Sequence, residues 1–171
     1  MAPKGSAFLY VHPERQAMIN PLVISHGWTT DASEPGPFGN TAFIDRLQMQ
    51  GTRDHAAWLT EPSAINFRAQ HGWGKVTASC KDLVQDTAQR VAAMTGLSAF
   101  SSPEFCAPQM VAMPVPPCDT ADLQRQLLMQ FGIEMPCFTW ADHHIVRVSA
   151  QGYNSKAQMD HLVHALGKLL P

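Results

Sequence analysis

The sequence predicts an α/β domain in which helices pack on one face of a small antiparallel or mixed sheet. From residue 75 to residue 171 the apolar pattern follows the order helix, strand, helix, strand, strand, helix, which is typical of such a two-layer arrangement. The chain has 171 residues, of which 45% are hydrophobic and 15% charged, and this composition suffices for one sizeable core. The net charge of −2 with scattered basic residues argues against nucleic acid and anionic membranes as partners.

The N-terminal residues 1–72 are predicted to form a separate and mostly irregular part. The apolar residues 8–11 are expected to be a strand, yet no preceding element or local hairpin supplies the neighbours that its backbone needs. Residues 20–52 are rich in glycine and proline and are expected to be a long loop over another surface. We therefore expect the chain to be the C-terminal part of a larger domain.

Two helices are expected next. A short helix begins near Thr60, where Pro62 falls in the first turn and its missing N–H costs little, and Gly72 lies beyond the end. Residues 75–94 carry apolar side chains at three- and four-residue spacing, which predicts a longer helix that stops at Gly96. This helix is expected to open a C-terminal α/β domain.

A strand and a third helix follow. Residues 110–115 are apolar and are closed by two prolines, which predicts a strand. Asp119 or Thr120 is expected to cap a helix that ends at Gly132.

The C-terminal end is predicted to contain a hairpin and a last helix. Residues 134–140 and 144–149 have strand patterns and are separated by the short loop 141–143, which favours antiparallel pairing. Ser155 is expected to cap the last helix. Its buried stripe is predicted to comprise Met159, Leu162, Val163, Leu166 and Leu170.

Arg147 is the first candidate binding residue. Alternation along the strand places Val146 and Val148 on one face and Arg147 with Ser149 on the other. A guanidinium group binds a planar carboxylate through two parallel N–H bonds, so Arg147 is suited to an amino acid or a keto acid. The alternative is that this face of the strand only contacts solvent.

Two loop segments are the other candidates. Gly51-Thr52-Arg53-Asp54 offers backbone N–H groups and a hydroxyl that could hold a phosphate. The alternative is a capping turn with Asp54 as N-cap and Arg53 exposed. Ser25-His26-Gly27-Trp28 places an imidazole and an indole beside a glycine, which is compatible with a ligand wall or with loop packing.

The cysteines and histidines do not favour a metal site. The four cysteines are widely spaced without a C-x-x-C pair, so buried free thiols are expected. His143-His144 falls in a predicted turn, and His161 with His164 lacks a carboxylate at metalloprotease spacing, so solvated histidines are expected. The glycine motifs of nucleotide-binding proteins and of serine hydrolases are absent from the sequence, which excludes several large enzyme classes.

Four segments occur in a defined order along nearly the whole chain: residues 2–11, residues 21–28, residues 51–54 with Trp58-Leu59, and residues 146–154. Together they resemble the C-terminal part of class V aminotransferase-fold enzymes, which depend on pyridoxal phosphate, and in particular the isopenicillin N epimerase-like branch. The resemblance implies the small domain of a fold-type I pyridoxal-phosphate enzyme for residues 73–171. Residues 1–72 would be a remnant of the large cofactor-binding domain and an interface loop.

The resemblance also implies roles for individual residues. Arg147 would bind the substrate carboxylate. Gly51 and Thr52 would contact the phosphate of pyridoxal phosphate in the neighbouring subunit, so a homodimer is expected for the full-length form. His26 and Trp28 would lie in a loop near the cofactor.

The sequence departs from this family at a decisive point. The family's Schiff-base lysine lies just upstream of the segment that contains Lys4, and Lys4 matches a later lysine instead. Met49-Gln50 also replaces the family's aromatic residue before the glycine-threonine pair. With no catalytic residue assigned, the chain alone is expected to be inactive and not to hold the cofactor.

Two functions remain open at this point. The first is the C-terminal portion of a pyridoxal-phosphate enzyme that acts on an amino-acid-like small molecule by epimerisation, transamination or lyase chemistry. The second is a non-catalytic remnant or interaction domain that docks a strand edge on another chain. The sequence has no signal-peptide pattern and no apolar run of membrane-spanning length, so a cytoplasmic location is expected.

Overall fold

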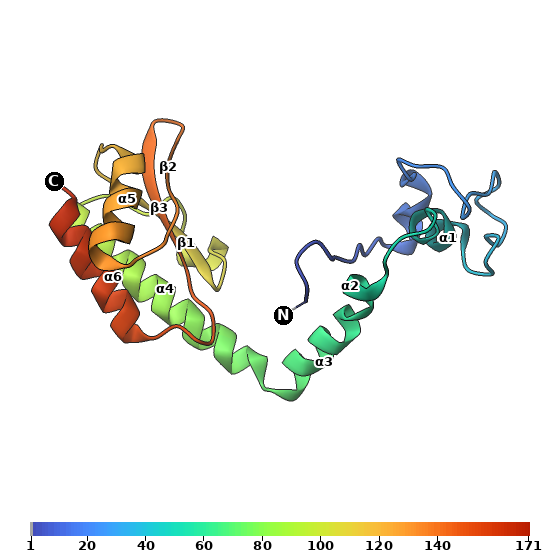
Figure 1. The fold of residues 1–171 in the computed structure, drawn as a ribbon, viewed down its shortest axis with the longest axis horizontal. Coiled ribbons are helices and arrows are strands. Elements are labelled where there is room, and N and C mark those ends of the chain that lie inside the picture. Colours follow the sequence, from blue (N-terminus) through green and yellow to red (C-terminus); the bar gives the residue numbers. More distant parts are fainter. Residues whose placement is uncertain (1) are drawn as a thin grey trace. The chain divides into compact units, whose positions relative to one another are not determined.

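The computed structural model describes residues 2–171, and the chain divides into two compact units. The first extends to Ala69, and the second runs from Gln70 to Pro171. The sequence predicted a boundary between residues 72 and 73. Figure 1 labels the helices and strands of both units.

The second unit contains an antiparallel three-stranded sheet with the order β1-β3-β2. Its strands are β1 (Met110–Val115), β2 (Cys137–Trp140) and β3 (His143–Ser149). The central strand β3 pairs with both neighbours, so that Val146 lies opposite Met113 on one side and Cys137 on the other. The sheet is therefore wholly antiparallel, which is one of the two arrangements predicted.

The hairpin between β2 and β3 is tighter than the sequence predicted. Ala141 and Asp142 have φ angles of 45° and 65°, as a two-residue type I′ turn requires. His143 therefore belongs to β3 instead of the turn. The predicted start of β2 at residue 134 is also wrong, because the pairing with β3 begins at Cys137 and the preceding Pro136 has no N–H to donate.

The three long helices begin and end close to the predicted positions. They are α4 (Trp73–Thr95), α5 (Thr120–Phe131) and α6 (Lys156–Leu169). The Asp119 carboxyl group accepts from the first backbone N–H groups of α5, and Ser155 forms a capping box with Gln158 at the start of α6. Gly96 and Gly132 end α4 and α5 with φ angles of 71° and 65°, which glycine adopts most readily.

One face of the sheet packs against the helices (Figure 1): α4 lies on β1, α5 lies on β2, and α6 contacts both helices. Val84 from α4, Leu127 from α5, Val146 from β3 and Leu166 from α6 are completely buried in this core. The predicted stripe of α6 is confirmed, with Met159, Leu162 and Leu166 buried and Val163 and Leu170 partly buried.

The first unit consists of short helices and loops. Its elements are the 3-10 helix η1 (Pro13–Met18), α1 (Ala42–Gln48), α2 (Ala56–Leu59) and α3 (Glu61–Gln70). The short helix predicted from Thr60 corresponds to α3. The loop of residues 20–52 is interrupted by α1, which the sequence did not predict. Another 3-10 turn, η2 (Pro103–Phe105), lies in the second unit before β1.

The strand predicted at residues 8–11 is wrong, because this segment has no regular secondary structure and no strand beside it among the described residues. The side chains of Phe8, Leu9, Tyr10 and residues 22–24 are exposed, for example Phe8 at 72% and Leu22 at 103%, whereas Val11 is half-buried. Water hydrogen-bonds to the backbone of an unpaired segment, so without a neighbouring strand the extended conformation of residues 8–11 is not stabilised. This part of the chain therefore presents exposed apolar side chains.

Among residues 2–171, no helix combines the length and the apolar character that a membrane crossing needs.

Replacement of Leu166 by alanine is expected to destabilise the second unit by about 2–5 kcal/mol, because it leaves a cavity at a fully buried position. Leu128→Ala is the matched control, since Leu128 is also helical but 51% exposed, and it is expected to cost about 0.5 kcal/mol or less. Urea unfolding followed by far-UV circular dichroism measures both values. Equal effects of the two substitutions would contradict this description of the core.

Candidate functional site

The segments around Gly51 and His26 meet at one hollow in the first unit. It has a volume of about 430 Å³, and its lining residues are His26, Phe38, Met49, Gly51, Thr52, Arg53 and His55. The structure thus brings together His26, Gly51 and Thr52, which the sequence singled out in two separate segments. A hydroxyl, a guanidinium group and two imidazoles at one hollow offer hydrogen-bond donors suited to an anion. We call it the anion hollow.

Backbone contacts hold the two segments of the anion hollow together. The Gly27 N–H donates to the Met49 carbonyl at 2.9 Å, and within the first segment the Trp28 N–H donates to the Ser25 carbonyl at 2.9 Å. Gly51 has a φ angle of 109°, a conformation that side chains other than hydrogen rarely allow. The exposed Thr52 follows directly, so its hydroxyl is presented by a turn that depends on glycine.

Trp28 does not line the anion hollow. Its ring lies under the Arg46 guanidinium group at 4.7 Å, within the range of a cation–π contact. The same guanidinium donates to the Thr29 carbonyl. In this structure Trp28 is therefore a packing residue of the loop, which is one of the two interpretations that the sequence left open.

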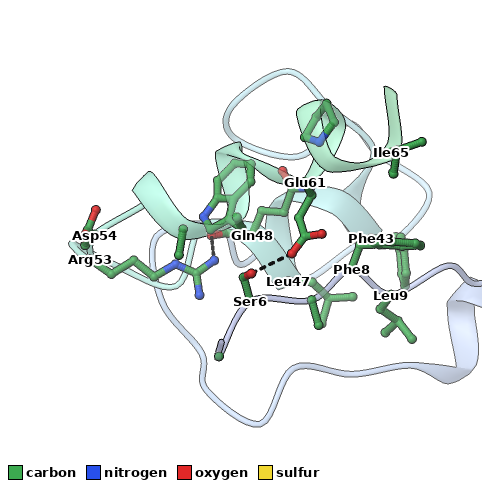
Figure 2. Close-up of a pocket in the computed structure, with 15 residues that line it drawn as sticks. Ser6, Phe8, Leu9, Phe43, Leu47, Gln48, Arg53, Asp54, Glu61 and Ile65 are labelled. Atoms are coloured by element: carbon green, nitrogen blue, oxygen red, sulfur yellow. Dashed lines mark hydrogen bonds between the residues drawn. The ribbon is translucent and has the colours of Figure 1, made fainter. Parts of the chain in front are cut away.

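A second and larger hollow of about 710 Å³ lies in the same unit (Figure 2). Arg53 lines both hollows, and in Figure 2 its guanidinium group donates to the Gln48 carbonyl at 3.2 Å. Glu61 accepts from the Ser6 hydroxyl at 2.7 Å. Most of the wall is apolar and includes Phe8, Leu9, Phe43, Leu47 and Ile65.

Asp54 has a local structural role. Its carboxyl group accepts from the Ala56 N–H at 2.8 Å and so satisfies a backbone donor in the first turn of α2. The N-cap of α2 is His55, so the alternative with Asp54 as N-cap is wrong, although Asp54 does stabilise the turn before α2. Gly51 and Thr52 lie at the anion hollow.

Arg147 lies in the second unit on the exposed face of β3. Val146 and Val148 are buried while Arg147 and Ser149 are exposed, which confirms the predicted alternation. Arg147 is one of the residues that line a hollow of about 600 Å³, together with Asn154, Gln158, His161 and the buried Met159 and Leu162 of α6. We call it the arginine hollow.

The Arg147 guanidinium group has no acidic partner within ion-pair distance among residues 2–171. Arg90 differs, because it pairs with Asp160 at 2.6 Å. Arg125 likewise pairs with Asp122. Arg147 therefore keeps its planar fork available for a carboxylate from outside the described chain.

The cysteines are all free thiols, with Cys80 and Cys137 buried. Burial, with a smaller effect of Cys118, raises the pKa of the Cys137 thiol to about 11. Among the described residues no group of histidine, cysteine and acidic side chains is arranged to hold a metal ion. His161 makes a hydrogen bond with the Phe131 carbonyl at 2.9 Å, and His144 Nδ1 accepts from the Cys118 N–H.

Sequence comparison identifies relatives along almost the whole chain. The chain is 32% identical to an isopenicillin N epimerase of Amycolatopsis lactamdurans over 175 residues. It is 33% identical to one of Streptomyces clavuligerus over 179 residues. Each alignment covers 99% of this chain and 44% of the relative. A probable chloroplastic L-cysteine desulfhydrase of Arabidopsis thaliana is 27% identical over 99% of this chain and 37% of its own length. The chain thus spans less than half of these relatives, and no family profile matches it.

Solved structures share the fold. An alanine–glyoxylate aminotransferase from Nostoc sp. superposes with a TM-score of 0.53 and 23% identity, covering 70% of this chain and 32% of its own. An 8-amino-7-oxononanoate synthase from Francisella tularensis gives a TM-score of 0.55 and 13% identity, with 74% and 37% covered.

The fold is that of the small domain of fold-type I pyridoxal-phosphate enzymes, as predicted. Within this class the chain is a relative of the isopenicillin N epimerases, the branch that the four ordered segments indicated. Phe38, Met49, Arg53 and His55 complete the anion hollow but were not among the predicted site residues. Arg53 and His55 adjoin the glycine-threonine pair in sequence, whereas no sequence signal points to Phe38.

Iodoacetamide is expected to label Cys106 well before Cys137 at about pH 8, because a thiol with a raised pKa has little reactive thiolate. Cys137 is 8% exposed and has a pKa of about 11, whereas Cys106 is partly exposed. Peptide mass spectrometry of samples quenched over time gives the two rates. The Cys137 rate should rise as the pH approaches its pKa, and equal rates at about pH 8 would contradict the burial described here.

Proposed function

We propose that this chain is the C-terminal portion of a pyridoxal-phosphate enzyme of the isopenicillin N epimerase type. The enzyme acts on an amino-acid-like small molecule by epimerisation, transamination or elimination at the α-carbon. The proposal is supported by about one-third identity along 99% of the chain to two isopenicillin N epimerases. It is also supported by the shared fold of the small domain.

Arg147 is the substrate-binding residue in this proposal. The observation that carries it is the exposed guanidinium group at the arginine hollow, which no acidic side chain among residues 2–171 neutralises. A guanidinium group binds a carboxylate in a bidentate and planar manner, so it orients the substrate as well as attracting it. Arg147 lies opposite Ala112 of β1, and its N–H donates to the Pro136 carbonyl at 3.0 Å, which limits the positions that its side chain reaches.

The anion hollow fits the phosphate of the cofactor. Thr52 offers a hydroxyl, Gly51 a backbone N–H in a turn, and Arg53 a positive charge at the same hollow. When bound, pyridoxal phosphate supplies an electron sink for the substrate's α-carbon. Gly51 and Thr52 hold the phosphate in this proposal, and His26 contributes a further donor.

The full-length enzyme is a cytoplasmic homodimer in this proposal, in which Gly51 and Thr52 serve the cofactor of the partner subunit. Trp28 lies in the loop near the cofactor in this proposal, where its ring packs on Arg46. Lys4 does not correspond to the lysine that attaches the cofactor in the relatives. The chain of 171 residues is therefore inactive by itself, because no residue of it is assigned to covalent attachment.

Arg147→Lys is expected to weaken binding of pyruvate about fivefold or more, because lysine keeps the charge but loses the bidentate fork. Pyruvate is titrated into the ¹⁵N-labelled chain, and the amide signals of Ser149 and the arginine Nε–Hε signals are followed. Arg125→Lys is the matched control, since Arg125 is already paired with Asp122. Unchanged pyruvate binding by Arg147→Lys would contradict the assigned role.

The purified chain mixed with pyridoxal phosphate is expected to show no stable adduct on a single lysine. The absorbance between roughly 320 and 500 nm is recorded, and the sample is then reduced with borohydride and mapped by mass spectrometry. Scattered labelling of exposed lysines is the expected result. A stoichiometric adduct on one lysine would refute the proposed inactivity of the chain and make it an enzyme candidate in its own right.

A further inference from the structure

Asp45 is a completely buried acidic residue in α1 that lines neither the anion hollow nor the arginine hollow. Its Oδ2 accepts from the Phe38 N–H at 2.7 Å, and its Oδ1 accepts from the Asn40 side-chain amide at 2.7 Å. Both donors come from the loop that precedes α1. Because a buried carboxyl group without hydrogen bonds is costly, the loop and Asp45 hold each other in one conformation.

Two glycines allow the chain to pack directly on Asp45. A Cβ atom at Gly27 would lie 1.8 Å from the Asp45 carbonyl oxygen, and a Cβ atom at Gly36 would lie 2.3 Å from Asp45 Oδ2. No larger side chain fits at either position without moving the backbone. Segments on both sides of the loop are thus fitted around this one residue.

Asp45 also connects with the anion hollow through the backbone. Its carbonyl accepts from the Met49 N–H at 2.9 Å, and the Met49 carbonyl accepts from the Gly27 N–H at 2.9 Å. Gly27 is covalently joined to His26, while Phe38 is held by the Asp45 carboxyl group itself. Three of the residues that line the anion hollow, His26, Phe38 and Met49, therefore depend on Asp45 for their position.

We propose that Asp45 is a positioning residue for the anion hollow, which sets His26 and Phe38 against the turn of Gly51 and Thr52. It touches no ligand. Its carboxyl group fixes the loop and its carbonyl fixes the backbone that presents the donors. The proposal rests on the proposed function in so far as that hollow binds phosphate.

Asp45→Asn tests this role, because asparagine keeps the size of the side chain but presents an NH₂ group to one of the two donors. The variant keeps the Asp45 carbonyl, so its effect reaches Gly27 through displacement of α1, whose C-cap residue Met49 accepts from the Gly27 N–H. The Gly27 amide is expected to exchange with deuterium about tenfold faster in the variant. Affinity for inorganic phosphate, followed at the Gly51 and Thr52 amides by NMR titration, is expected to fall about fivefold or more.

Asp31→Asn is the matched control. Asp31 lies in the same loop, and its carboxyl group accepts only local hydrogen bonds from Ser33, at 2.8 Å from the N–H and 2.6 Å from the hydroxyl. This variant should change neither the exchange of Gly27 nor phosphate affinity. Asn40→Ala is a second and milder test, since it keeps Asp45 but removes one donor, and it should give the same pattern of changes with a smaller size.

The outcomes separate the two proposals. Faster Gly27 exchange in Asp45→Asn and Asn40→Ala, but not in Asp31→Asn, would support the positioning role. If the wild-type chain binds no phosphate, only the phosphate assignment is refuted, and the positioning role still stands on the exchange data. Unchanged Gly27 exchange in both Asp45→Asn and Asn40→Ala would overturn the positioning role of Asp45. Equally faster exchange of every amide in the first unit would also overturn it, because Asp45 would then stabilise the unit as a whole.

Discussion

Burial of one face of the three-stranded sheet against α4, α5 and α6 is the constraint on which the second unit depends. The central strand β3 contributes Val146 and Val148 to this face, and neither side chain retains appreciable exposure. Because successive side chains of a strand point to opposite faces, burial of these two valines forces Arg147 outward. The burial of these valines thus fixes the register of β3, and a one-residue slip of the strand would move Arg147 to the buried face.

The first unit is organised on a different principle. Among its described residues, Ala42 is the sole buried hydrophobic side chain, at 3% exposure. The acidic Asp45 is more deeply buried, at 0%. Hydrogen bonds to Asp45 and close approaches of Gly27 and Gly36 replace an apolar core. Polar organisation of this kind gives one defined conformation but little hydrophobic stabilisation. The exposed Phe8 and Leu22 side chains are consistent with a surface that is made for contact with further protein.

The two units carry complementary chemistry. The arginine hollow presents a planar cation suited to a carboxylate, and the anion hollow presents a hydroxyl, backbone N–H groups and a guanidinium group suited to a phosphate. An amino-acid substrate has a carboxylate and pyridoxal phosphate has a phosphate, so both hollows match the chemistry of the enzymes that the chain resembles.

The sequence by itself determined the order of elements from α4 to α6, the helix cap at Ser155, and the alternation that exposes Arg147, because periodicity and capping are local properties. It narrowed the cap of α5 to Asp119 or Thr120, and the structure decided for Asp119. The order of four short segments also indicated the similarity to the isopenicillin N epimerases, to which the chain is 32% and 33% identical. The tertiary structure alone decided that residues 8–11 do not form a strand, that β2 starts at Cys137, and that Trp28 packs on Arg46. It also decided the burial of Asp45, since hydrogen-bond partners and close approaches between separated segments leave no periodic trace in the sequence.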